Sequence, residues 1–149
     1  MYGTLFNPAD RERVVDRISR LTPASQRRWG TLTAPRAVAH MADQLRIGLG
    51  EIPVRRARGP LRFAPLRFLF IHVLPWPKGR AKGPRETFTN APSEFAADLA
   101  ELTNLVRRFS VKDVGENWPL NPVFGHITGP DWGVLSYRHL DHHLRQFGV

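Results

Sequence analysis

Apolar side chains recur every three or four residues in four stretches of the chain, which is the pattern of α-helices with one buried face. The first stretch begins at Asn7 and Pro8, a cap followed by a helix-starting proline, and ends near Leu21. The second begins at residues 33–35, Thr-Ala-Pro, and runs to about residue 48–50. His40 falls at the margin of its inner face, which consists of Ala37, Val38, Met41, Leu45, Gly48 and Leu49.

The third and fourth stretches lie in the second half of the chain. The third begins at Ser93, a good N-cap residue. Its apolar side consists of Phe95, Leu99, Leu102, Leu105, Val106 and Phe109. The fourth follows Thr128, which forms a variant capping box with Asp131. No segment alternates as a strand would and no repeat is present, so we expect one all-α domain, 1–149, with a four-helix bundle fold.

A long crossover joins the second and third helices. Residues 52–92 hold seven of the 13 prolines, so this segment is expected to be irregular. Its middle, residues 61–74, is compatible with one short helix broken by Pro65. Residues 112–129 are predicted to form a loop.

The fourth helix carries the most informative chemistry. At about 100° per residue, His139 and His143 fall inside its apolar stripe, whereas Arg138, Asp141 and Arg145 fall on the opposite side. Side chains four residues apart on a helix can share a metal ion, and without cysteines such a site must use nitrogen and oxygen ligands. A zinc protease is disfavoured because Leu140 stands where its motif needs Glu. The alternative is a pair of core histidines bonded to protein groups.

The net charge of +9 is concentrated in the crossover, where residues 52–85 hold nine basic and no acidic side chains. This segment is either a solvated connection or a local anion-binding surface. As an anion site it would hold the carboxylates of a small substrate or acidic thiol, through Arg55, Arg56, Arg58 and Arg62. The segment could also bind the phosphates of a nucleic acid, with Phe63, Phe68 and Trp76 as stacking surfaces for bases. This alternative is disfavoured, because no nucleic-acid motif accompanies the charge.

The distribution of apolar residues also bears on location and assembly. The N-terminal residues lack a basic stretch followed by an apolar run, so we expect a cytoplasmic protein without a secretory signal. The most apolar stretch, residues 68–76, is interrupted by His72 and Pro75 and is shorter than the ~20 residues of a membrane span, so membrane insertion is not expected. Its apolar residues would suit a homodimer interface.

Several short motifs occur together in one order along the chain. They are Leu21-Thr22-Pro23, Trp29-Gly30, Ala39-His40-Met41, Leu74-Pro75-Trp76-Pro77-Lys78-Gly79, Asn121-Pro122-Val123-Phe124-Gly125 and the ending from Trp132-Gly133 through His139 to Gly148. In these motifs the chain resembles the DinB-like (YfiT-like) superfamily of metal-binding proteins, and within it an uncharacterised bacterial branch. The terminal block is the most specific of them.

This resemblance implies a four-helix bundle, often dimeric, with one metal ion, commonly nickel or zinc. In the family three histidines hold the ion, and those positions match His40, His139 and His143. Characterised relatives include S-transferases and a maleylpyruvate isomerase that use low-molecular-weight thiols. One departure is Asn121, where the branch has His, and His126 does not obviously replace it.

The residues around the three histidines complete the predicted site. Gln44, Asp43 and Gln146 are candidate acceptors for the outer ring N–H groups, and His142 lies at the edge of the face. Three neutral imidazoles leave a coordination position for water or substrate. The sequence thus indicates a metal-dependent S-transferase or hydrolase acting on a small anionic molecule, and Asp43, Glu51 and Asp141 are its candidate bases by proximity alone. The alternatives are a non-enzymatic metal-binding or stress-associated protein and, third, a nucleic-acid-binding module.

Overall fold

The structure is a computed structural model that describes residues 2–55, 59–79 and 83–149. Over these ranges the regular structure is helical, with no strand and one isolated β-bridge between Asn121 and Gly125. The prediction of an all-α chain is confirmed. The four long helices are α1 (Pro8–Ser19), α2 (Ala34–Gly48), α4 (Phe95–Ser110) and α5 (Gly129–Gln146). Among the helices of these ranges, none has both the length and the apolar character that a membrane span requires.

Local capping explains where the long helices begin. The Asn7 side chain accepts hydrogen bonds from the N–H groups of Ala9 and Asp10, and Thr33 accepts one from Arg36. Thr128 and Asp131 form the predicted capping box of α5.

The predicted cap of α4 is wrong by one residue. Glu94, not Ser93, accepts hydrogen bonds from the N–H groups of Ala96 and Ala97. Ser93 instead donates from its N–H and hydroxyl groups to the two carboxylate oxygens of Asp98, at 2.8 and 2.6 Å. The longer Glu94 side chain therefore pairs with the free backbone N–H groups of the first turn of α4.

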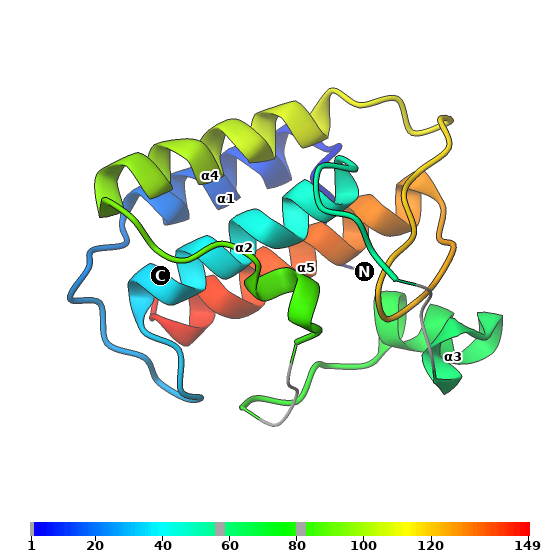
Figure 1. Ribbon diagram of the computed structural model, residues 1–149, viewed down its shortest axis with the longest axis horizontal. Helices are drawn as coiled ribbons and strands as arrows, with labels where there is room; N and C mark the ends of the chain where they lie inside the picture. The colour runs from blue at the N-terminus through cyan, green and yellow to red at the C-terminus, as the bar shows by residue number, and fades with distance from the viewer. Residues whose placement is uncertain (1, 56–58, 80–82) are drawn as a thin grey trace.

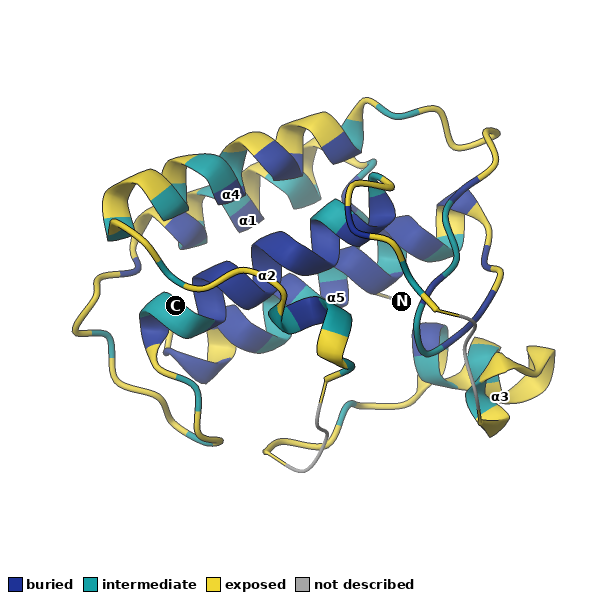
Figure 2. Cartoon of the chain, viewed as in Figure 1, coloured by how far each residue is buried: buried dark blue, intermediate teal, exposed yellow. Residues whose placement is uncertain are grey.

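The four long helices pack in pairs around a common core. Figure 1 shows α1 beside α4 and α2 beside α5, and contacts also join α2 to α4 and α1 to α5. A short 3₁₀ helix, η3 (Arg85–Phe88), covers a further part of α2. As a result, α2 is buried along nearly its whole length (Figure 2), and a side chain in its middle, such as His40, lies in the interior.

Close packing at Gly48 provides a test of this arrangement. A Cβ atom at Gly48 would lie 2.6 Å from Phe109 Cε2 and 3.3 Å from the Trp132 ring, and both rings are fully buried. We expect Gly48→Ala to lower the free energy of unfolding by about 1–3 kcal/mol through overpacking, although alanine favours helices. Urea unfolding measures this. Gly115→Ala, in an exposed loop, should change the value by less than about 0.5 kcal/mol, and an equal effect at both sites would contradict the packing.

The crossover has more structure than the sequence predicts. It contains a 3₁₀ helix, η1 (Pro60–Arg62), the short helix α3 (Ala64–Phe68) and a π-helix, η2 (Leu69–Val73). Pro65 does not break the helical segment, because it lies in the first turn of α3, where a missing N–H costs no hydrogen bond. Figure 1 shows α3 apart from the four long helices.

The predicted outward orientation of Arg138 on α5 is also wrong. Its guanidinium donates to the carbonyl groups of Phe70, Ile71 and Leu74, at 2.7, 2.6 and 2.5 Å, and the residue is buried. The helical wheel places Arg138 away from the apolar stripe, but η2 covers that side of α5. A second buried surface on α5 follows from this contact.

Candidate metal centre

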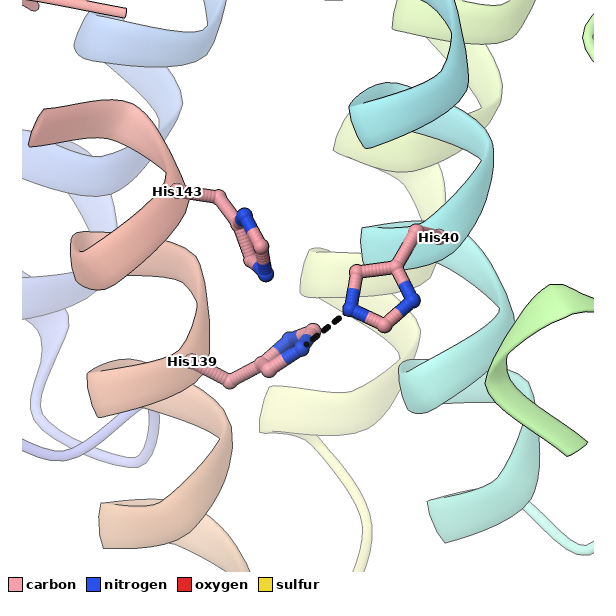
Figure 3. Close-up of side chains that lie close together, drawn as sticks. All are labelled: His40, His139 and His143. Atoms are coloured by element: carbon pink, nitrogen blue, oxygen red, sulfur yellow. Dashed lines mark hydrogen bonds between the residues drawn. The ribbon is translucent and has the colours of Figure 1, made fainter. Parts of the chain in front are cut away.

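Three imidazole rings meet between α2 and α5 (Figure 3). His40 comes from α2, and His139 and His143 come from successive turns of α5. One ring nitrogen from each lies within 4.8 Å of the others, and the Nε2 atoms of His40 and His139 are 2.9 Å apart. Two nitrogens bound to one ion at about 2.0–2.1 Å are roughly 2.9–3.4 Å apart. The three predicted ligands are therefore close enough to bind a metal ion.

The orientation of the His40 ring is fixed by the backbone of η3. Its Nδ1 atom lies 2.8 Å from the carbonyl oxygen of Thr87. A carbonyl only accepts, so Nδ1 carries the hydrogen and donates it, which leaves the Nε2 lone pair facing the other histidines. The Phe88 ring stacks on the imidazole at 4.3 Å between centroids. Thr87 was not predicted, because a backbone carbonyl leaves no signal in the sequence.

His143 is oriented in the same way by a side chain. Its Nδ1 atom lies 2.8 Å from Gln146 Oε1, and Gln146 Nε2 donates to the carbonyl of Trp29 at 2.7 Å. The second contact fixes the amide, so Oε1 must accept and His143 Nδ1 must donate. Gly30 permits this approach, since a Cβ atom there would lie 2.6 Å from Gln146 Nε2. Gln146 thus accepts the outer N–H of His143 and fixes the orientation of its ring.

His139 differs from the other two histidines. Its Nδ1 atom is closed to solvent and has no hydrogen-bond partner among the described residues, and its Nε2 atom faces His40 Nε2. An unsatisfied buried polar atom costs about 1–3 kcal/mol. Without an ion, His139 Nε2 donates to the bare Nε2 atom of His40, and Nδ1 of His139 stays unpaired among the described residues. An ion bound to Nε2 would leave Nδ1 unpaired as well, so this atom does not separate a metal site from a cluster of core histidines.

The surroundings keep all three rings neutral. Burial lowers the pKa of His40 and lowers that of His143 to about 3. Burial, followed by the proximity of His40 and His143, holds the pKa of His139 well below its usual value. Neutral imidazole is the form that binds metal ions, so the site is ready for a ligand role at neutral pH.

A rim of aromatic and basic groups borders the cluster. His142 is half-buried and packs against Trp29 and Trp76, at 5.8 and 6.1 Å between ring centroids. Lys78 Nζ lies 4.8 Å above the Trp29 ring. His142 therefore lies beside the three histidines and not among them.

Two other predicted neighbours of the ligands have different partners. Gln44 donates from Nε2 to Ser136 Oγ at 3.1 Å, and its Oε1 atom is buried without a partner among the described residues. Asp43 is fully buried and accepts two hydrogen bonds from Asn90 and one from Arg46. Neither side chain receives a ring N–H from the three histidines.

The remaining candidate bases are occupied by arginines. Glu51 pairs with Arg108, and Asp141 accepts from Arg17 of α1 at 2.7 Å. The expectation that Asp141 points outward is wrong, because α1 packs against that side of α5. Both carboxylates therefore stabilise contacts between segments.

The predicted anion-binding arginines are only partly described. Arg56 and Arg58 lie outside the described residues. Arg55 is exposed, and the Arg62 guanidinium lies 5.0 Å from the Phe63 ring centroid. Among the described residues, the cations that lower the pKa of the histidine rings are instead Arg36, near His40, and Lys78 and Arg138, near His142. Anion binding by the predicted set stays a prediction.

Asn121, where the resemblance leads one to expect His, has a local structural role. Its side-chain oxygen accepts from the N–H groups of Val123 and Phe124, both at 2.9 Å, and its backbone pairs with Gly125. His126 is exposed, and its carbonyl accepts from Arg67. Asn121 thus closes a tight turn before α5.

In comparisons with known proteins, the chain matches no family model, no curated protein and no solved structure.

Proposed function

We propose that this chain is a DinB-like (YfiT-like) four-helix bundle that holds one divalent metal ion, nickel or zinc, on His40, His139 and His143. The observation that carries the proposal is the paired orientation of two rings: Thr87 and Gln146 take the Nδ1 hydrogens of His40 and His143. This leaves an Nε2 lone pair on each ring for a ligand. The long crossover between α2 and α4, with the motifs of the terminal block, supports the family assignment.

We propose an activity of S-transferase or hydrolase type on a small anionic molecule. An ion held by three imidazoles keeps a position for water or substrate, and it can lower the pKa of a bound water or thiol and polarise a carbonyl. In the transferase case a low-molecular-weight thiol is the second substrate. Lys78, beside Trp29 and His142 at the rim, offers a positive charge to an anion entering from that side.

A non-enzymatic metal-binding or stress-associated role is the second candidate. The candidate general bases favour this role, because Asp43, Glu51 and Asp141 all bind arginine or asparagine side chains and are not free to accept a proton from a substrate. A thiol added to the cobalt-substituted protein separates the two candidates. A change in the cobalt absorption bands supports an open coordination position, whereas unchanged bands favour the structural role.

Metal content tests the site itself. Protein purified without an affinity tag should contain about one divalent ion per chain by mass spectrometry. We expect His143→Ala to reduce this to a small fraction, because one of three ligands is removed. His142→Ala is the matched control, since this histidine lies outside the cluster, and it should keep the ion. Equal metal content in the wild type and His143→Ala would exclude the site.

A further inference from the structure

The crossover forms a projecting arm, residues 60–74, made of η1, α3 and η2. Among the described residues, six of the nine large apolar side chains that are exposed belong to this arm. They are Phe63, Leu66, Phe68, Leu69, Val73 and Leu74. The two phenylalanines are 55% and 58% exposed. Figure 2 shows α3 of the arm as a mostly exposed projection, whereas α2 and α5 are mostly buried. Such a concentration of apolar surface is typical of a binding site.

The arm is fixed in this position by polar contacts along its inner side. Arg138 binds three of its carbonyl groups, and His72 Nε2 lies 2.7 Å from Asp131 Oδ1 of α5. Arg67 donates to the carbonyl of His126 at 2.8 Å, and Ile71 is fully buried. These contacts prevent the outer side chains from folding onto the core. Their exposure is therefore a stable property of the fold.

The charge around the arm indicates what it contacts. Residues 52–85 hold nine basic side chains and no acidic one; Arg62, within the arm, and Arg55, which precedes it in the sequence, are exposed. A symmetric contact with a second copy would bring two such segments together and is opposed by their repulsion. Nucleic acid would match the charge, but the aliphatic side chains among the six offer bases no stacking surface. An anionic lipid surface matches both the charge and the apolar side chains.

We propose that the arm docks on a membrane surface rich in anionic phospholipid, with Phe63 and Phe68 entering the boundary between headgroups and acyl chains. Arg55 and Arg62 then lie at the level of the lipid phosphates. Attachment of this kind is reversible, because it combines a small apolar area with electrostatic attraction to the headgroups. It does not depend on the metal site.

Vesicle sedimentation of the full-length protein tests the proposal. We expect binding to phosphatidylcholine vesicles that contain phosphatidylserine and little binding to vesicles of phosphatidylcholine alone. Replacing both Phe63→Ser and Phe68→Ser should weaken binding about tenfold or more. Arg55→Gln and Arg62→Gln should each weaken it about fivefold, and less at high salt.

Matched controls lie on α4 and just beyond its end. Val111→Ser removes an apolar side chain that is 82% exposed, and Arg107→Gln removes an exposed arginine; both should leave vesicle binding unchanged. No binding, or equal binding to both kinds of vesicle, would overturn the proposal. Two further outcomes would overturn it, both with vesicle binding left intact by the phenylalanine substitutions. In the first, the substitutions abolish a dimer seen by sedimentation velocity; in the second, they weaken binding to single-stranded DNA. Far-ultraviolet circular dichroism confirms that each variant folds.

Discussion

Replacement of Arg138 by methionine is expected to lower the free energy of unfolding by about 3–5 kcal/mol, because three backbone carbonyls lose a charged donor. Burial lowers the pKa of Arg138, but an arginine stays charged in proteins. Its guanidinium also lies 3.7 Å from the ring centroid of Tyr2 and 4.9 Å from that of Trp76. A methionine fills much of the same volume but cannot bind the carbonyls, so the contact between the arm and α5 should weaken, although His72 and Asp131 still join them.

Thermal and urea unfolding measure this effect, with an expected drop in Tm of about 10 °C for a chain of this size. Arg107→Met, at an exposed position of α4, is the matched control and should change stability by less than about 0.5 kcal/mol. Arg138→Lys should recover only part of the loss, since a single ammonium group cannot match the planar guanidinium. A loss at Arg138 no larger than at Arg107 would contradict the anchoring role.

The long helices could be predicted because their signals are local. An Asn or Thr cap, a proline in the first turn and apolar spacing of three to four residues act within one helix, as at Asn7 and Thr33. The capping box at Thr128 is of the same kind. Where two neighbouring residues compete for one cap, as Ser93 and Glu94 do, the outcome depends on the Asp98 side chain and is not visible from spacing alone.

The crossover could not be predicted, because distant partners fix its structure. Residues 69–73 form a π-helix whose carbonyls meet Arg138, more than 60 residues later in the chain. The helical wheel of α5 assigns Arg138 to solvent because it counts one buried face, whereas α5 has two. A basic residue with three backbone partners leaves no periodic signal.

The candidate site was predictable only in part, because two of its histidines are close together in the sequence and its other groups are distant. His139 and His143 could be paired from their spacing on one helix. His40 lies 99 residues before His139, and only the family resemblance joined it to the pair. Gln146 is three residues from His143 and could be named as its partner, but the carbonyl of Thr87 belongs to η3, a helix that the sequence did not predict. The three histidines were thus easier to predict than the groups that orient them.

The metal-free protein is expected to lose stability as the pH falls below about 6.5, with the histidine cluster as the cause. Burial lowers the pKa of His40, His139 and His143 in the folded protein, with that of His143 at about 3. In the unfolded chain these rings have pKa values near 6.5. Below that pH the unfolded chain therefore binds protons that the folded protein does not, and acid favours unfolding. Above pH 6.5 both states are neutral and this contribution is constant.

For His143 alone, the loss is about 2 kcal/mol between pH 6.5 and pH 5, before most carboxylates are protonated. Urea unfolding with a chelator present, repeated at several pH values, measures the slope. His143→Gln should lower overall stability but flatten this slope by about 1.4 kcal/mol per pH unit, because one proton-binding group is removed. Val111→Ser, which removes an exposed side chain without a titrating group, should leave the slope unchanged. A slope identical in the wild type and His143→Gln would mean that His143 is not held neutral in the folded protein.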